Sequence, residues 1–257
     1  DIFGSRGLGD VYKRQHLQGL LTHLFIDIHS LLFLQLKLNT ILNSKINFLH
    51  SVFSLLIVST IFLFYYSESV YNYLVMEDGI IEYSTAIFLF SISIYMISKL
   101  IKSIKTISLK NIGIILFSII FFFGFGEEIS WGQRIFSIES PPFFSENNLQ
   151  SETNIHNLMI GGVKLNKLIF TNGLFFIFLF YFLALPYLYA KFNNVKSIIN
   201  RFSIVIPKYS QSIIFICSTI IIYIFDHDRI SEIWECLFAF TMLITSINPL
   251  NKQEIYS

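Results

Sequence analysis

Apolar residues recur along this chain in long runs that short polar segments separate. A helix needs about 20 apolar residues to cross the roughly 30 Å hydrocarbon core of a bilayer. Six runs approach that length, and they predict six helices whose ends are set to within a few residues. These helices are 46–66, 79–100, 111–136, 168–190, 212–225 and 230–248. The predicted fold is an all-α, polytopic transmembrane bundle with one long outer loop.

Composition agrees with this pattern. Hydrophobic residues make up 54% of the chain and charged residues 14%, and the mean hydropathy is +0.63. A soluble domain of this length does not carry so many long apolar runs, so we expect one transmembrane domain over 43–257 with the lipid bilayer as partner. Cys217 and Cys236 lie in apolar runs without metal-type spacing. No basic stripe carries interleaved aromatics, so nucleic acid is not an expected partner.

The first residues do not resemble the rest of the chain. Residues 1–15, DIFGSRGLGDVYKRQ, are similar to the conceptual translation of a transposase-type sequencing adapter, and we expect that they are an artefact. Residues 16–42 are rich in Leu, His and Gln, whereas the later chain favours Ile, Phe, Lys and Asn. This stretch is either translated upstream sequence, which we prefer, or an additional segment.

The distribution of Lys and Arg predicts the orientation. Outside the first 15 residues, eleven basic side chains fall on one side of the predicted helices and four on the other. The eleven are Lys37, Lys45, Lys99, Lys102, Lys105, Lys110, Lys191, Lys196, Arg201, Lys208 and Lys252, and the four are Arg134, Lys164, Lys167 and Arg229. Basic residues accumulate on the cytoplasmic side of a membrane. Both termini are therefore predicted to be cytoplasmic, in a cell membrane.

Acidic residues follow the opposite distribution and lie at one depth. Glu82, Glu127 and Glu232 each lie 16 or 17 residues from the cytoplasmic ends of their predicted helices. At about 1.5 Å per residue this places all three roughly 25 Å across the membrane. Ionisable groups at such a depth are costly and are usually functional. We therefore expect one polar site near the outer face.

The segment GEEISWGQR concentrates this chemistry. Glu127 and Glu128 follow a stretch, 112–125, that has no charged residue. In a continuous helix Glu127, Trp131 and Arg134 are spaced i, i+4 and i+7 and share one face. Buried carboxylates must be paired, and Arg134 and Arg229 are the predicted counter-ions.

The long loop adds a second polar segment. Large polar residues recur at alternate positions, at Asn148, Gln150, Glu152, Asn154 and His156. An extended backbone would put these five on one face. A helix would instead bring Glu152 and His156 together at i, i+4. The sequence leaves both conformations open.

These two segments carry a resemblance. GEEISWGQR followed by NNLQSETNIHNL resembles a group of multi-pass bacterial membrane proteins over about 77–235, and that group implies a bacterial membrane protein without an assigned activity. A more distant similarity is to the CAAX-protease-like glutamate membrane hydrolases, whose first motif is Glu-Glu-x-x-x-Arg. Here five residues separate Glu128 from Arg134, and Glu152 stands where Phe would precede His156 by four residues.

The leading functional hypothesis is a membrane hydrolase or transferase that acts on a lipid or lipid-linked substrate. The alternatives are a transporter or ion-binding protein and a non-catalytic scaffold. We expect almost no polar residues in the inner half of the bundle, and this argues against a transport path. Glu127 or Glu128 is the candidate general base, His156 a proton carrier, and Arg134 the charge-balancing group. Candidate substrate-binding residues are Trp131, Gln133, Asn148, Gln150, Asn154, Asn157, Glu232 and Glu235. Candidate ligands for a divalent metal ion are Glu82, Glu152 and His156.

Overall fold

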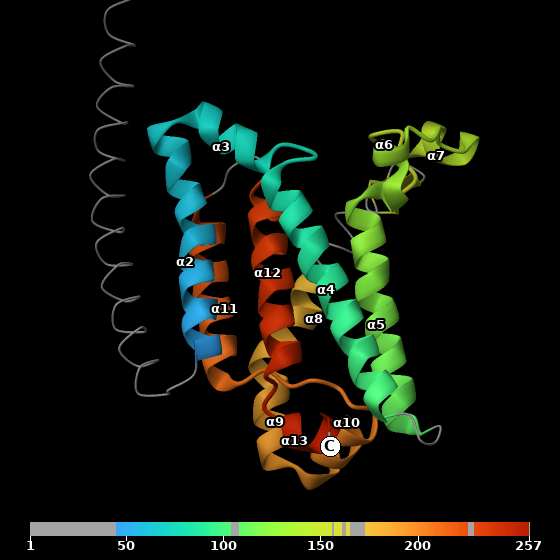
Figure 1. Ribbon diagram of the computed structural model, residues 1–257. Helices are drawn as coiled ribbons and strands as arrows, with labels where there is room; N and C mark the ends of the chain where they lie inside the picture. The colour runs from blue at the N-terminus through green and yellow to red at the C-terminus, as the bar shows by residue number, and fades with distance from the viewer. Residues whose placement is uncertain are drawn as a thin grey trace, which may run out of the picture.

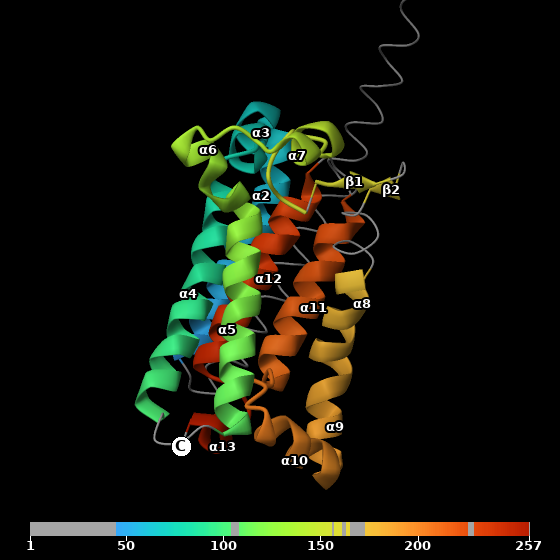
Figure 2. The same ribbon diagram turned by 90° about the vertical axis from the view of Figure 1, so that its right-hand side faces the viewer.

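The computed structural model confirms the all-α class. It describes residues 45–103, 108–155, 157–160, 163–164, 173–225 and 229–256. Figures 1 and 2 show a bundle of long helices, with the short α3, α6 and α7 at one end and α10 and α13 at the other. The only strands in the described ranges are two-residue strands paired in antiparallel fashion.

The elements follow the predicted order with some additions. They are α2 (Lys45–Tyr66), α3 (Glu68–Val75), α4 (Ile80–Ser103), α5 (Leu109–Glu128), η1 (Ser130–Gly132), α6 (Gln133–Phe136), α7 (Pro142–Asn147), β1 (Met159–Ile160), β2 (Val163–Lys164), α8 (Leu174–Leu179), η3 (Phe180–Ala184), α9 (Leu185–Lys191), α10 (Asn193–Arg201), α11 (Tyr209–Ile224), α12 (Ile230–Ile247) and α13 (Lys252–Tyr256). The predicted segment 1–42 lies outside the described residues.

Four helical stretches among the described residues are long and apolar enough to cross a membrane. They are α2, Glu68–Ile101, α5 and α12. A fifth arises if Phe176–Lys191 and Asn193–Arg201 count as one, although a bend of 114° separates them. At 16 residues, α11 is apolar but shorter.

Helix α12 forms the centre of the bundle. It packs on α2, α4 and α11, and Figure 1 shows it between α2 and α4. Ile233 and Leu237 are fully buried, and the Phe240 ring lies 3.9 Å from that of Phe53 on α2. A helix that is apolar all round is stable where other helices surround it, which explains why α12 is the most buried of the long helices.

The chain alternates between the two ends of this bundle. We call the end where α5 and α11 finish and α4 and α12 begin the acidic end, and the opposite end the basic end. Lys99 and Lys110 lie at the basic end, where Lys99 sits above the Tyr95 and Tyr256 rings and Lys110 donates to the Glu254 carbonyl.

The third predicted helix, 111–136, is wrong as a continuous helix beyond residue 128. Helix α5 ends at Glu128, and Ser130, Trp131 and Gly132 then adopt positive φ angles of 46°, 55° and 78°. The reversal brings the Trp131 ring back against Gly126, where a Cβ would lie 2.8 Å from the ring. Gly126 permits this contact because it has no side chain.

The fourth predicted helix, 168–190, is divided into segments. The structure describes it from residue 173, as α8, the π-helical η3 and α9. Pro186 follows the π-helical turn. Proline has no backbone N–H to donate, and the wider turn before it accommodates the missing helical hydrogen bond. The sharp bend lies later, at Phe192, before the polar helix α10.

The inner half of the bundle is more polar than the sequence suggested. His50 on α2 and Thr241 on α12 are fully buried and lie 3.0 Å apart. The Thr241 hydroxyl donates to the Leu237 carbonyl, so it accepts from Nε2 of His50. Further buried polar residues on α2, α11 and α12 include Asn47, Ser51, Ser54, Gln211, Ser212, Thr245 and Ser246. The expectation of an almost wholly apolar inner half was wrong because uncharged polar residues do not interrupt an apolar run.

The contact between α5 and α10 generates a prediction. A Cβ on Gly113 would lie 1.7 Å from the Phe202 carbonyl oxygen, whereas a Cβ on Gly124 of the same helix would meet a Leu89 methyl at 3.4 Å. Gly113→Ala should lower the free energy of unfolding by about 1–3 kcal/mol because the backbones must separate. Gly124→Ala, the matched control, should be neutral or stabilising by up to about 1 kcal/mol. Thermal denaturation in detergent measures both, and equal midpoints for the two variants would contradict the close approach.

Candidate functional site

A polar cavity of about 240 Å³ lies at the acidic end. Carboxylates from α4, α5 and α12 converge there with side chains of the loop 148–157. The lining residues are Glu77, Glu82, Glu127, Glu128, Ser130, Arg134, Gln150, Glu152, Asn154, Asn157, Arg229, Ser231, Glu232 and Glu235. With seven Glu and two Arg, hydrogen-bond acceptors and negative charge dominate the wall.

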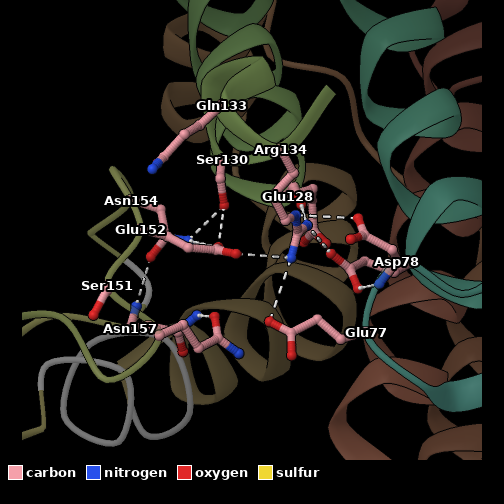
Figure 3. Close-up of polar contacts among 12 residues, drawn as sticks. Glu77, Asp78, Glu128, Ser130, Gln133, Arg134, Ser151, Glu152, Asn154 and Asn157 are labelled. Atoms are coloured by element: carbon pink, nitrogen blue, oxygen red, sulfur yellow. Dashed lines mark hydrogen bonds and ion pairs between the residues drawn. The ribbon is translucent and has the colours of Figure 1, made fainter. Parts of the chain in front are cut away.

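Arg134 is the main counter-ion of this cavity. Its guanidinium contacts Glu82 at 2.7 Å, Asp78 at 3.1 Å, Glu152 at 3.2 Å and Glu77 at 3.3 Å, as Figure 3 shows in part. It also donates to the Glu128 carbonyl at 3.2 Å. The arginine side chain is only 20% exposed, so water screens these pairs less than it screens surface ion pairs.

The protonation of Arg134 follows from these neighbours. Burial by itself lowers the pKa of Arg134, but the hydrogen bond and the charge of Glu82, together with Glu152 and Asp78, outweigh it and raise the pKa above its ordinary value. The guanidinium is therefore a permanent positive charge between α4 and the loop. Arg229, the other predicted counter-ion, is 45% exposed; its guanidinium lies 3.9 Å from the Glu77 carboxylate and donates to the Val75 carbonyl at 3.4 Å.

Glu127 holds the loop against the end of α5. One carboxylate oxygen accepts from Nε1 of Trp131 at 2.9 Å, and the other accepts from the backbone N–H of Ile155 at 2.6 Å. Glu127 is 7% exposed. Hydrogen bonds to a buried carboxylate are among the strong ones in proteins, so this side chain attaches two segments that are 28 residues apart.

In its described residues, 148–155 and 157, the loop forms neither the extended strand nor the helix that the sequence left open. Asn148 organises it: Oδ1 accepts from the backbone N–H groups of Gln150 and Glu152, and Nδ2 donates to the carbonyl and side-chain oxygens of Asn154. The Asn154 side-chain oxygen in turn accepts from the N–H of Asn157. Asn side chains can replace backbone partners in this way, and they favour compact turns over regular structure.

Ser130 is a cavity residue that the sequence analysis missed. Its hydroxyl donates to Glu152 Oε2 and accepts from Nδ2 of Asn154 at 2.8 Å. Asn154 Nδ2 also lies 3.0 Å from the same Glu152 oxygen, and Figure 3 shows the three side chains directed toward one another. A serine between an apolar helix and a Trp gives no distinctive pattern in the sequence, because only the fold brings Glu152 to it.

Glu128, Glu232 and Glu235 form the other side of the cavity. All three are half-buried. Within the described ranges, the Glu128 and Glu235 carboxylates form no hydrogen bond or ion pair with a cation, in contrast to Glu82, Glu127 and Glu152. They are the acids that the cavity leaves accessible to a bound molecule.

A second, apolar cavity of about 380 Å³ adjoins the first. Side chains of α4, α5, α8 and α12 form its wall, including Leu89, Phe121, Phe178 and Phe238. Three lining residues belong to both cavities, namely Glu127, Glu128 and Glu235. Their carboxylates therefore lie at the boundary between a polar and an apolar compartment.

The predicted site residues separate into groups. Lining the polar cavity are Glu82, Glu127, Glu128, Arg134, Gln150, Glu152, Asn154, Asn157, Glu232 and Glu235. Trp131, Gln133 and Asn148 lie outside its lining; Gln133 instead binds Ser140 and the N–H of Thr153. His156 and the Asp226–Asp228 segment lie outside the described residues.

Two of the predicted metal ligands, Glu82 and Glu152, share a partner. Both contact Arg134, whose guanidinium lies between them. Across the described part of the chain, which does not include His156, no group of three or more His, Cys, Asp or Glu side chains has an arrangement that suits a metal ion. The metal site stays a prediction.

No family model, curated protein or solved structure matches this chain. The resemblance carried by the GEEISWGQR and NNLQSETNIHNL segments stays a prediction. Function is therefore argued from the two cavities and their residues.

Glu127→Gln provides a test of the attachment between α5 and the loop. Gln keeps one oxygen but presents an N–H₂ group to the second donor, so one of the two N–H groups loses its acceptor. Loss of a hydrogen bond to a charged group costs about 1.5–3 kcal/mol. Amide hydrogen exchange at Ile155 should accelerate by about tenfold or more. Glu139→Gln, at an exposed position, is the matched control and should leave that rate unchanged; equal rates in both variants would contradict the attachment.

Proposed function

We propose that this chain is a multi-pass protein of the cell membrane with both termini in the cytoplasm. The alternation of helices between the acidic and basic ends supports it, as does the concentration of Lys and Arg at the basic end. The loop 129–164 and the polar cavity then face outward.

Cysteine accessibility tests this orientation. In a variant with Cys217 and Cys236 replaced by alanine, Ser145→Cys on α7 should react with a membrane-impermeant maleimide in intact cells. Asn194→Cys on α10 should react only after the cells are permeabilised. Both positions are exposed, so a difference reports the side of the membrane rather than burial. Labelling of Asn194→Cys in intact cells would reverse the assignment.

We further propose that the protein is a hydrolase or transferase that acts on an amphipathic, lipid-like substrate. The observation that carries this proposal is the pair of adjoining cavities with Glu127, Glu128 and Glu235 at their boundary. A polar headgroup suits the carboxylate- and amide-lined cavity, and a hydrocarbon chain suits the apolar one. The bond between head and chain would then lie beside the shared carboxylates.

The carboxylates have different roles in this proposal. Glu127 is a positioning residue, because two N–H groups already occupy its oxygens. Glu128 and Glu235 are the candidates for moving protons to and from the substrate, since each faces both cavities. Arg134 balances the charge of Glu82 and Glu152 and keeps α4, α6 and the loop together.

A transporter is the second candidate, favoured by the buried polar residues around His50 and Thr241. Fully buried apolar residues, Ile61 on α2 and Leu237 on α12, lie along the helices between that group and the acidic end. Such a layer favours a closed cavity over a transport path, which makes the enzyme our principal proposal.

Turnover of amphipathic esters and related lipids by protein in vesicles tests the enzyme. Glu128→Gln and Glu235→Gln should each reduce kcat by about 100-fold or more, as expected when a proton-transfer group is removed. Leu89→Trp fills the apolar cavity and should raise KM for long-chain substrates, whereas Ile87→Trp, at an exposed position two residues away, should not. Full activity in both glutamate variants would exclude their proposed role.

A further inference from the structure

We propose that Ser130 is a nucleophile, with Glu152 as its general base, and that the substrate bond is a carboxylic ester. This inference rests on the proposed enzyme function and names its chemistry. The sequence contains no recognisable nucleophile motif, but the fold joins Ser130 at the end of α5 to Glu152 in the loop.

The arrangement has the parts that an activated serine requires. The Ser130 hydroxyl donates to Glu152 Oε2, so the carboxylate is placed to accept its proton. Arg134 holds the other oxygen, Oε1, at 3.2 Å, and Asn154 donates to Oε2 at 3.0 Å. Arg134 and Asn154 are thus positioning residues that direct one Glu152 oxygen to Ser130.

The backbone at Ser130 is strained. Positive φ is unfavourable for residues other than Gly, and here Ser130 and Trp131 both adopt it. Strained residues persist where the surrounding structure imposes them, and they concentrate at active sites. Ser130 is 1% exposed and forms part of the wall of the polar cavity, so it lies beside the compartment where a headgroup would bind.

The chemical step balances without a cofactor. Ser130 Oγ forms a bond to the ester carbonyl carbon while Glu152 takes the hydroxyl proton. The ester C–O bond then breaks, and the alcohol leaves with a proton from Glu128 or Glu235. Water attacks the acyl-serine and gives a proton back to that carboxylate. The acyl–Oγ bond breaks, the acid is released, and Glu152 returns its proton to Ser130 Oγ. Asn154 Nδ2 lies 2.8 Å from Oγ and is a side-chain donor beside the reacting oxygen.

The cavity lining indicates the polar part of the ester. Seven glutamates line the cavity, and among them Glu128 and Glu235 carry the carboxylates that stay accessible as acceptors for a bound molecule. Hydroxyl or ammonium groups on the substrate would donate to these acceptors, whereas an anionic phosphate headgroup would meet mostly negative charge. The favoured substrate class is therefore an acyl ester whose polar part carries hydroxyl or amino groups.

An alkyl fluorophosphonate tests the nucleophile directly with the full chain in detergent or vesicles. Serine Oγ displaces fluoride from phosphorus and leaves a stable adduct that peptide mass spectrometry locates. We expect one adduct per chain, on Ser130. In Glu152→Gln the labelling rate should fall by about 100-fold or more. Ser130→Gly should abolish labelling, and glycine is suited to the positive φ at this position. Ser137→Gly, which changes a serine at φ 52° outside the cavity, is the matched control and should label as the wild type does.

The outcomes separate this inference from the proposed function. If the wild type hydrolyses esters while Ser130 stays unlabelled, or if Ser130→Gly keeps its activity, the nucleophile is wrong and the enzyme proposal stands. If the wild type neither hydrolyses any ester nor labels, both proposals are overturned. Mapping of the adduct on the wild type decides the site even if Ser130→Gly does not fold.

Discussion

The acidic end of this bundle depends on one partly buried guanidinium, that of Arg134. Arg134 contacts Glu77, Asp78, Glu82 and Glu152, which come from the start of α4, the residues before it and the distant loop. Carboxylates removed from water repel one another unless a cation lies between them. The position of α6 follows from this requirement, because Arg134 reaches all four only if the chain turns back after α5.

That reversal explains the local sequence. Gly126 leaves space for the Trp131 ring, the indole N–H binds Glu127, and Gly132 accepts a positive φ. The other oxygen of Glu127 fixes the loop at Ile155. The segment that begins as an apolar helix thus ends as a tight turn whose polar groups all face α4, α12 and the loop. The backbone strain at Ser130 and Trp131 is stabilised by these contacts.

The carboxylates have different roles because these contacts engage some of them and leave others accessible. Glu127 and Glu82 are engaged by N–H groups and by Arg134, so they maintain the shape of the cavity. Glu128 and Glu235 face both the polar and the apolar compartment, and Glu152 lies between Arg134 and Ser130. Adjacent glutamates in the sequence therefore differ in environment: Glu127 is bound from two sides, whereas the Glu128 side chain lines the cavities.

Apolar periodicity and length determined the all-α class and the order of the six main helical runs, because burial in a bundle or a bilayer demands long apolar segments. That Glu82, Glu127 and Glu232 lie at one level of the bundle also followed from the sequence, since helical rise converts spacing into distance. Tertiary structure alone decided where α5 ends, how the loop folds, and which carboxylates meet Arg134. Those features depend on contacts such as Glu127 to Ile155 and Ser130 to Glu152, which join residues more than 20 positions apart. Local patterns carry no information about such pairs, so a serine and a glutamate that are unremarkable in the chain become neighbours only in the fold.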